Sequence, residues 1–452
     1  MTNTKNTETV DVVVVGLGPG GEHTAIKLGR AGLDVVAIEN RLVGGECPYY
    51  GCVPSKMMIA AAHAVASVDR VPDFAGTAQV QPDWAQVARR VREEATDDWD
   101  DKAAVDRLVD SGVRFVRGTG HLDGPGRVVV GDTTYVATRG VVLNTGTAPT
   151  APPIDGLADT PYWTNRDAVA LTELPSSIVV LGGGPIGCEF AQIFARFGVR
   201  VTIVEAFDRL LAQDEPEASE LLEKALAAEG VQVLTGVEIA SVTHDDGTFT
   251  LDLGDQQVQA DKLLVAAGRR NNLAGIGLDT VGIDEDAKAV ETDEWLRAGE
   301  KLWAIGDITG KGAFTHVSMY QAAVVVRDVL GEGGAAADYR AVTRVTYTEP
   351  EVAGVGLTEQ QARDAGLEPS TAVGDLGARG WLAQEEGLIK LVADPERDIL
   401  VGASVVGSAG GEILSMLATA VHAEIPLPTL RGMHFAYPTF SRAVQTVLDD
   451  LE

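Results

Sequence analysis

The sequence has few cysteines and few basic residues, and each scarcity excludes a class of protein. Three cysteines in 452 residues are too few for the disulfide framework of a secreted protein. Lysine and arginine number 36 against 66 aspartates and glutamates, and the net charge of −30 argues against a nucleic-acid or anionic membrane surface. The charge does not identify a substrate, because acidic runs such as Asp97–Asp101 are usually solvated surface.

Long apolar runs are also missing. The first ten residues are polar and lack the apolar core of a signal peptide, and no apolar run reaches the roughly 18 residues that span a bilayer. We therefore expect a cytoplasmic protein that binds neither membrane nor nucleic acid. In a reducing compartment, a cysteine pair is more often catalytic than structural. The length predicts about three domains.

Cys47 and Cys52 lie five positions apart. In a regular helix, residues at this spacing have Cα atoms about 8–9 Å apart, whereas a disulfide needs less than about 7 Å. Gly51 relaxes the backbone between the sulfurs, Pro54 removes a helical hydrogen bond beyond them, and Pro48 suits the first position of a helix. The segment predicts a distorted helix start, where the helix dipole favours a thiolate.

This pattern favours a redox-active cysteine pair. Two alternatives stay open at this point, namely two unrelated buried thiols and a zinc site. A zinc site is disfavoured because the nearest histidine, His63, lies eleven residues beyond Cys52, which does not match the usual structural spacings. No metal site is predicted. Cys188 lies far away in another motif and is expected to be a small residue in helix packing.

A glycine fingerprint occurs twice, each time after an apolar strand and before a helical pattern. The first copy, with its downstream acid, recurs 166 residues later: Gly16, Gly18, Gly21 and Glu39 correspond to Gly182, Gly184, Gly187 and Glu205. The first glycine permits a tight turn, the second lets the backbone approach a pyrophosphate at the helix N-terminus, and the third allows close helix–strand packing. The acid accepts hydrogen bonds from ribose hydroxyls. Two copies predict two bound dinucleotides.

The second acid favours NADH over NADPH. Glu205 would repel a 2′-phosphate, and the three residues that follow it offer no cation. Arg209 lies close enough in sequence to accommodate that phosphate, so NADPH remains open.

Together these motifs resemble the flavoprotein disulfide reductases, the family of dihydrolipoamide dehydrogenase, glutathione reductase and mercuric reductase, over nearly the whole chain. The redox segment matches the family pattern GGxCxxxGCxPSK at Gly44–Lys56. Other family motifs match at Asn144–Gly146, Ala267–Arg269, Leu302–Asp307 and Tyr347–Glu359.

The resemblance implies an α/β fold with two doubly wound dinucleotide-binding domains and a C-terminal α+β dimerisation domain. Residues 1–150 and 266–335 are expected to form the FAD domain, and residues 151–265 the NAD(P) domain. Residues 338–452 are expected to form the dimerisation domain.

The resemblance also assigns roles to single residues. Cys52 should face the flavin, where its thiolate makes a charge-transfer contact, and Cys47 should exchange with the substrate. Lys56 should lie near flavin N5 and pair with Glu189. The first fingerprint should bind FAD and the second the nicotinamide nucleotide. The remaining cofactor contacts that it implies are at Gly45, Gly146, Gly268, Asp307 and Thr315.

The chain departs from the family near its C-terminus. Members resemble one another there in a histidine, followed five residues later by a glutamate, and this pair acts as the acid–base in the partner subunit's site. Here Tyr437 and Arg442 occupy the two positions. Tyrosine, with a pKa of about 10, is a poor acid–base at neutral pH, so ordinary dithiol exchange is expected to be impaired. Three explanations stay open. Tyr437 donates a hydrogen bond to a substrate that needs no proton shuttle, or His434 takes over the acid–base role. The third is that the acceptor is not a simple disulfide.

We therefore predict a homodimeric FAD enzyme whose active site is completed by the partner's C-terminal domain. Electrons should pass from NAD(P)H through flavin to the Cys47–Cys52 disulfide, and on to a small-molecule disulfide or other electrophile. Mercuric reductase resembles this chain in having a tyrosine at the position of Tyr437. Its relatives deliver metal through a C-terminal cysteine pair, however, and no cysteine follows Cys188 here, so mercury reduction is disfavoured. The alternatives are a diaphorase that reduces quinones directly from flavin, and a non-enzymatic redox sensor. Tyr49 and Tyr50 either shape an acceptor pocket or simply pack.

Overall fold

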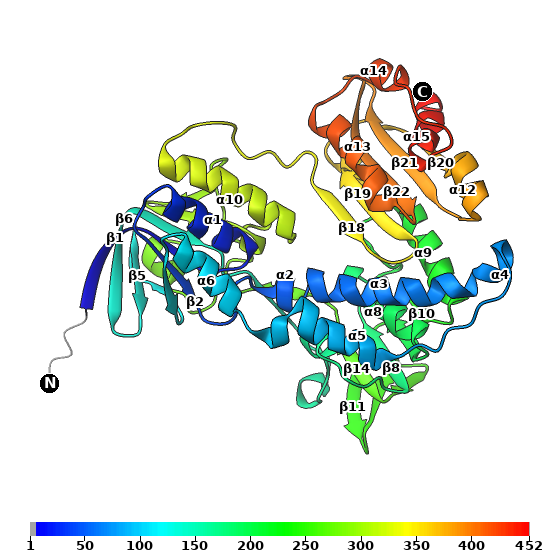
Figure 1. The fold of residues 1–452 in the computed structure, drawn as a ribbon, viewed down its shortest axis with the longest axis horizontal. Coiled ribbons are helices and arrows are strands. Elements are labelled where there is room, and N and C mark those ends of the chain that lie inside the picture. The colour runs from blue at the N-terminus through cyan, green and yellow to red at the C-terminus, as the bar shows by residue number, and fades with distance from the viewer. Residues whose placement is uncertain (1–5, 452) are drawn as a thin grey trace. The chain divides into compact units, whose positions relative to one another are not determined.

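The computed structural model describes residues 6–451 and is drawn in Figure 1. The chain divides into two compact units, which are described separately. The first contains the chain up to Pro54 together with Arg90–Pro149 and Arg269–Asp338. The second contains Ser55–Arg89, Thr150–Gly268 and the chain from Tyr339 onward.

The first unit is built on an eight-stranded sheet with the order β16-β17-β6-β1-β2-β3, to which β5 and β4 attach beyond β6. The pairs β17–β6, β6–β1, β1–β2 and β2–β3 are parallel. Residues 12–15 form an unbroken apolar run because parallel strands are covered on both faces, and all four are buried. The strands are β1 (Asn6–Val15), β2 (Val35–Glu39), β3 (Arg114–Arg117), β4 (His121–Leu122), β5 (Arg127–Val130), β6 (Thr133–Leu143), β16 (Arg297–Gly299) and β17 (Leu302–Ala304).

Helices of the first unit pack against this sheet through apolar side chains. Helix α1 contacts α10, and Leu28, Leu108 and Val325 belong to one buried cluster with strand residues Val12 and Val14. A short two-stranded sheet pairs β7 with β15. The remaining elements are α1 (Pro19–Arg30), α2 (Glu46–Tyr49), η1 (Val91–Ala95), η2 (Asp97–Trp99), α6 (Lys102–Asp110), β7 (Thr147–Pro149), β15 (Arg269–Asn271), η4 (Leu278–Val281), η5 (Asp307–Thr309) and α10 (Thr315–Leu330). Helix α3 (Cys52–Asp69) continues from the first unit into the second.

The second unit contains a smaller parallel sheet with the order β10-β9-β8-β14, beside an antiparallel sheet of β11, β12 and β13. Phe249, Leu251 and Leu263 link the two sheets in one buried cluster. The elements are α4 (Val71–Phe74), α5 (Trp84–Arg90), η3 (Leu157–Asp159), α7 (Asn165–Val169), β8 (Ser177–Leu181), α8 (Pro185–Arg196), β9 (Arg200–Val204), α9 (Pro216–Ala228), β10 (Gln232–Leu234), β11 (Ser241–Asp245), β12 (Thr248–Asp252), β13 (Gln257–Ala260) and β14 (Lys262–Val265).

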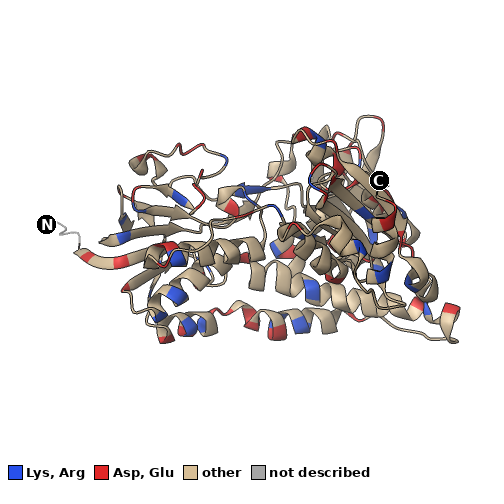
Figure 2. Cartoon of the chain, turned by 90° about the horizontal axis from the view of Figure 1, so that it is seen from above, with Lys and Arg blue, Asp and Glu red and all other residues tan. Residues whose placement is uncertain are grey.

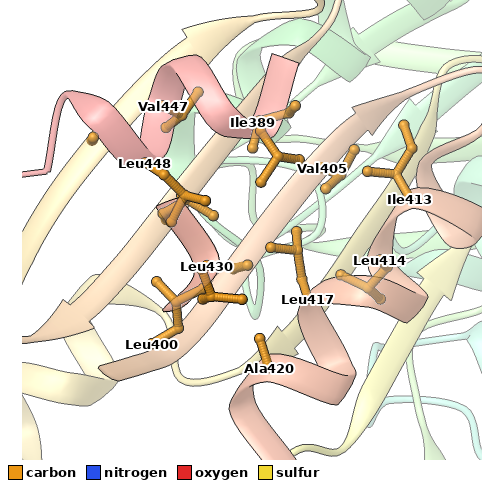
Figure 3. Packing of buried hydrophobic residues seen from close by; sticks show 14 of the residues in the cluster. Ile389, Leu400, Val405, Ile413, Leu414, Leu417, Ala420, Leu430, Val447 and Leu448 are labelled. Carbon is orange, nitrogen blue, oxygen red and sulfur yellow. The ribbon is translucent and has the colours of Figure 1, made fainter. Parts of the chain in front are cut away.

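The C-terminal part of the second unit is a five-stranded antiparallel sheet, β18-β19-β22-β21-β20. Helices α13 and α15 pack their apolar sides on it, and Figure 3 shows Leu417 and Leu448 among the sheet residues Ile389, Leu400 and Val405. The elements are β18 (Thr343–Thr346), β19 (Glu351–Gly356), α11 (Glu359–Asp364), β20 (Ser370–Asp375), α12 (Gly377–Ala383), β21 (Leu388–Asp394), β22 (Ile399–Gly407), α13 (Gly410–His422), α14 (Leu427–Arg431) and α15 (Phe440–Asp449).

The predicted fold class is confirmed. Each glycine fingerprint follows a central parallel strand, and an antiparallel sheet with covering helices closes the chain. Acidic residues are spread along the helices and loops, as Figure 2 shows, and basic residues lie among them.

One helical stretch, Glu46–Asp69, is long and apolar enough to cross a membrane by length and composition. The expectation drawn from unbroken apolar runs missed it because a few polar residues interrupt its sequence. A single helix of this kind is weak support for a membrane span.

Candidate functional site

Cys47 and Cys52, the predicted redox pair, lie on either side of a helix break. Helix α2 ends at Tyr49, Tyr50 has φ −137°, and α3 begins at Cys52. At Gly51 a Cβ would lie 3.2 Å from the carbonyl oxygen of Glu46, so a side chain there would press on the preceding turn. The predicted distortion is therefore present.

The prolines contribute less to this break than the sequence indicated. Pro48 is the third residue of α2 rather than the first, and Pro54 is the third residue of α3. The first N–H groups of a helix have no helical acceptor, so Pro54 interrupts no hydrogen bond there. The break arises at Tyr50 and Gly51 instead.

The break brings the two sulfurs into contact. The thiols of Cys47 and Cys52 are hydrogen-bonded to each other, and this contact, followed by burial, raises the pKa of Cys47. The hydroxyl of Thr315, the first residue of α10, lies 3.5 Å from Cys52 Sγ. Its hydrogen bond to Cys47 works in the opposite direction and lowers the pKa of that thiol. Cys52 is the first residue of α3, and the N-terminus of a helix is the position at which the helix dipole stabilises negative charge.

Lys56 and Glu189 form a bidentate ion pair within the second unit. Lys56 Nζ lies 2.9 Å from Glu189 Oε1 and 2.7 Å from Oε2. The backbone N–H of Tyr347 donates to the same carboxylate at 3.0 Å, and Lys56 Nζ lies 4.7 Å from the centre of the Tyr347 ring. Glu189 is buried on α8, where an unpaired negative charge would be unfavourable. The Lys56 ammonium and the Tyr347 N–H compensate its charge.

The two glycine fingerprints are built alike down to their hydrogen bonds. In the first, Glu39 Oε2 accepts from the N–H of Leu17 at 2.7 Å, and Oε1 accepts from Arg41 at 2.8 Å. In the second, Glu205 Oε2 accepts from Gly183 at 2.5 Å, and Oε1 accepts from Phe207 at 2.8 Å. The 166-residue repeat therefore holds for the acid's partners as well as for the glycines.

The glycines leave no room for side chains where the fingerprint packs. A Cβ at Gly16 would lie 2.4 Å from the carbonyl oxygen of Asn144, and one at Gly21 would lie 2.1 Å from that of Gly16. In the second copy a Cβ at Gly182 would lie 2.7 Å from the carbonyl oxygen of Ala266. One at Gly187 would lie 1.9 Å from the carbonyl oxygen of Gly182. The close helix–strand packing expected of the third glycine is present in both copies. The first glycines, Gly16 and Gly182, have φ of +87° and +112°, as the tight turn expected of them requires.

The residues present fit the phosphates of two dinucleotides. Gly18 and Gly184 are the N-cap residues of α1 and α8, and neither helix start is capped by a side chain. The first-turn N–H groups are therefore available to an anion. A Cβ atom added at Gly184 would have no other atom within 4 Å, so the space beside it is open. A Cβ atom added at Gly45 would lie 2.8 Å from Gly18 Cα. Only glycine at position 45 lets these two backbone segments approach so closely.

A polar chain links Asp307 to the redox segment in the first unit. Thr147 Oγ1 donates to Asp307 at 2.8 Å, and Arg269 Nε donates to Thr147 Oγ1 at 2.7 Å. The Arg269 guanidinium also lies 3.6 Å from Glu46, the neighbour of Cys47. Two further glycines were predicted to contact a cofactor. The space beside Gly146 is open, with no atom within 4 Å of its Cβ position, and Gly268 has a φ of +151°, which favours glycine.

Tyr437 and Arg442 line one cavity of about 220 Å³ in the second unit. Tyr437 is 74% exposed, and Thr439, the N-cap of α15, accepts from the N–H of Arg442 at 3.2 Å. His434 is exposed and is not among the cavity's lining residues. The two substituted positions thus line the same cavity.

Three residues beside the predicted site were missed from the sequence. Trp99 contacts the chain between the two cysteines, Tyr347 contacts both Lys56 and Glu189, and Arg269 joins Thr147 to Glu46. Arg269 and Tyr347 lie within matched motifs, but no spacing rule linked them to these partners. Cys188 is fully buried on α8 and donates to the Gly183 carbonyl, as its packing role predicted.

Comparison with known proteins gives the same assignment. Residues 10–322 match the family described as pyridine nucleotide-disulphide oxidoreductase, and residues 342–448 match the dimerisation domain of that family. The chain is 34% identical to mercuric reductase of Streptomyces lividans, covering 96% of this chain and 94% of the relative. It is 32% identical to dihydrolipoyl dehydrogenase of Halobacterium salinarum, with coverage of 96% and 94%.

A solved structure shares the whole fold. The Cu(II) complex of the HOCl-induced flavoprotein disulfide reductase RclA from Escherichia coli matches with a TM-score of 0.86 at 25% identity. The match covers 98% of this chain and 100% of that chain. With the paired sulfurs and the two fingerprints, these matches show that the chain belongs to the pyridine nucleotide-disulphide oxidoreductases, the flavoprotein disulfide reductases that use FAD and NAD(P)H.

Proposed function

We propose that this enzyme passes electrons from NADH, through FAD, to a Cys47–Cys52 disulfide and from the resulting dithiol to an electrophilic acceptor. The observation that carries the proposal is the contact between the two thiols at the break between α2 and α3. Sulfurs held in contact can alternate between dithiol and disulfide without a large backbone movement.

The cofactor sites follow the two fingerprints. Gly16, Gly18, Gly21 and Glu39 would hold FAD with help from Asp307, and Gly182, Gly184, Gly187 and Glu205 would hold NADH. When bound, FAD supplies the chemistry that accepts a hydride and returns an electron pair to a disulfide. Residues 1–150 and 266–335 would form the FAD domain, 151–265 the NAD(P) domain and 338–452 the dimerisation domain.

The protein's own residues then hold charge and exchange sulfur. Glu189 fixes the Lys56 cation in one place, where it can stabilise negative charge on a reduced ring. Cys52, at the helix start, keeps the thiolate, and Cys47 attacks the acceptor. With a disulfide acceptor, this attack releases one thiol and leaves a mixed disulfide on Cys47. Cys52 then attacks the Cys47 sulfur, which restores the Cys47–Cys52 disulfide and releases the second thiol.

The replaced acid–base pair selects the acceptor. When an ordinary disulfide is cleaved, the leaving thiolate must be protonated, and Tyr437 is poorly suited to this near neutral pH. Acceptors whose products leave without a proton are therefore favoured, such as aromatic disulfides with acidic thiols. We propose that the partner subunit's C-terminal domain supplies Tyr437 and Arg442 in a homodimer. The cytoplasmic location stays a prediction.

A thiophilic metal ion is the second candidate acceptor. Two thiolates that form a disulfide release two electrons and no proton, which is enough to reduce one Hg(II) ion to Hg(0) or two Cu(II) ions to Cu(I). A mercuric reductase and a Cu(II) complex of RclA are among the similar proteins. The described residues contain no group of three or more metal-ligating side chains, so such an ion would be bound as a substrate by the two sulfurs.

An anaerobic acceptor screen tests the proposal. Wild-type, C47S and C52S proteins would be assayed with NADH and an aromatic disulfide, Cu(II), lipoamide, glutathione disulfide or a quinone. We expect the aromatic disulfide or Cu(II) to exceed lipoamide and glutathione disulfide at least tenfold, and C47S to abolish that activity. Full acceptor reduction by both cysteine variants would instead support the diaphorase. No NADH consumption with any acceptor would support the sensor.

A further inference from the structure

A strained turn lies against the redox segment of the first unit. We call residues Asp97–Asp101 the acidic turn. Its first three residues, Asp97, Asp98 and Trp99, have φ of +49°, +56° and +57°, in the left-handed region. This conformation is strained for residues other than glycine, so such a backbone persists only where surrounding contacts stabilise it. The π-helical turn η1 leads directly into it, and such turns are frequent at functional sites.

Trp99 contacts the chain between the two cysteines. Its indole N–H donates to the carbonyl of Tyr49 at 3.1 Å, and its ring stacks on Tyr50 with centroids 6.4 Å apart and planes at 25°. Tyr49 is buried and Tyr50 is half-buried. These tyrosines therefore pack, and they pack at the break that brings Cys47 and Cys52 together.

The other end of the acidic turn holds the chain before Cys47. The Asp101 carboxylate accepts from the backbone N–H of Val43 at 2.7 Å and pairs with Arg117 at 2.5 Å. It is only 8% exposed, although a run of aspartates was expected to be solvated. Burial, and then the charge of Asp101, raise the pKa of Tyr49 to about 12. The acidic turn thus contacts the redox segment on both sides of Cys47.

We propose that Trp99 is a positioning residue for the redox disulfide, and this inference rests on the proposed function. Through Tyr49 and Tyr50, it holds the break between α2 and α3 open. Without that hold, the segment can relax toward a regular helix, in which residues five apart lie about 8–9 Å from each other. That separation exceeds the reach of a disulfide. Loosening the turn should therefore favour the dithiol over the disulfide.

The test is a glutathione equilibrium on the FAD-loaded protein. The reaction is dithiol plus glutathione disulfide, giving the Cys47–Cys52 disulfide plus two glutathione thiols, and the oxidised fraction is measured by acid quench, alkylation and mass spectrometry. We expect W99L to lower the equilibrium constant at least tenfold, which makes the potential about 30 mV less negative for this two-electron couple. W99F keeps the stacking but loses the indole donor, so a smaller decrease is expected.

Two matched controls separate positioning from general destabilisation. D98G places glycine at φ +56°, which it adopts without strain, and should keep the wild-type constant within twofold. W84L removes a tryptophan of the second unit whose indole likewise donates to a carbonyl, that of Leu171, at 3.0 Å. It too should keep the wild-type constant.

The outcomes distinguish the inference from the proposed function. If wild-type protein forms no Cys47–Cys52 disulfide at any glutathione ratio, the proposed function fails and the inference fails with it. If wild-type forms the disulfide and W99L has the same constant, or W84L shifts it equally, the inference alone is overturned. Should W99L not fold, W99F and Y50L decide, because Y50L removes the stacking partner from the other side. If W99F and Y50L both have the wild-type equilibrium constant with glutathione, the positioning role of Trp99 is overturned.

Discussion

Lys56 and Glu189 meet in a bidentate pair, with Nζ 2.7 Å and 2.9 Å from the two carboxylate oxygens. The carboxylate is buried, the lysine is partly exposed, and the N–H of Tyr347 fixes the carboxylate from a third direction. The lysine cation is thus held in one place on α3, one helical turn beyond Cys52.

Neutralising this carboxylate should slow flavin reduction. E189Q keeps the size of the side chain but removes the charge that orients Lys56, a loss of about 2 kcal/mol for a charge-assisted hydrogen bond. We expect the rate of flavin reduction by NADH to fall roughly thirtyfold, measured by anaerobic stopped flow. The matched control is E229Q, because Glu229 also forms a bidentate pair, with Arg196 at 2.6 and 2.8 Å. Equal slowing in both variants would assign the effect to stability.

Restoring the family acid–base pair should broaden the acceptor range. The cavity that Tyr437 and Arg442 share places the two positions together, so Y437H with R442E can rebuild an imidazole–carboxylate pair there. We expect the double variant to raise kcat/KM for lipoamide or glutathione disulfide at least tenfold near pH 7. The single variant Y437H should gain less, since its imidazole has no carboxylate to orient it. If neither substrate gains, proton transfer does not limit the reaction.

The second fingerprint should discriminate between nicotinamide cofactors. Glu205 is held by the N–H groups of Gly183 and Phe207, and the Phe207 side chain is 63% exposed at the position that Arg41 occupies in the first copy. We expect wild-type flavin to be reduced faster by NADH than by NADPH. E205A with F207R should reverse the preference, because it removes the repelling charge and adds a cation for the 2′-phosphate. Faster reduction of the wild-type flavin by NADPH would refute the cofactor assignment.

Acid should destabilise the protein through His63. Burial lowers the pKa of His63 from its ordinary value near 6.5, against the opposing charge of Glu349, and its Nε2 is buried without a hydrogen-bond partner in the part of the chain that is described. A histidine with a lowered folded pKa takes up its proton first in the unfolded chain. Its contribution to stability is therefore present above pH 6.5 and is lost as the pH falls below that value.

Urea denaturation of wild-type and H63N proteins between pH 5 and 8 checks this. The stability advantage of wild-type over H63N should shrink as the pH falls from about 7 to 5. H434N is the control because His434 is exposed, and its difference from wild-type should stay constant. A wild-type advantage over H63N that is independent of pH would show that His63 does not titrate in this range.

The parts of the site that were predicted from sequence are those fixed by local backbone geometry. The glycines of each copy imply a tight turn and close helix–strand packing, and both copies have them. The predicted hydrogen bonds from ribose hydroxyls to Glu39 and Glu205 stay a prediction, whereas the backbone N–H groups that these carboxylates accept from were not predicted. A disulfide between Cys47 and Cys52 is incompatible with a regular helix, and the predicted distortion is present at Tyr50 and Gly51.

The missed parts depend on contacts between distant segments. The Tyr347 N–H reaches Glu189 across 158 positions of sequence, and no local pattern encodes that contact. The acidic turn was interpreted by its charge alone, because a left-handed run of non-glycine residues has no sequence signature. Its Trp99 and Asp101 are recognised as part of the redox segment's surroundings only when their partners are seen in space.

The central claim is that the Cys47–Cys52 pair takes part in electron transfer from NADH, and anaerobic titration of the FAD-loaded protein with NADH tests it most directly. Addition of two electrons should produce a long-wavelength absorption band from the Cys52 thiolate against oxidised flavin, with both cysteines becoming open to alkylation. The band should be absent from the same titration of C52S. If two electrons bleach the flavin directly, without the band and with the disulfide intact, the account is contradicted.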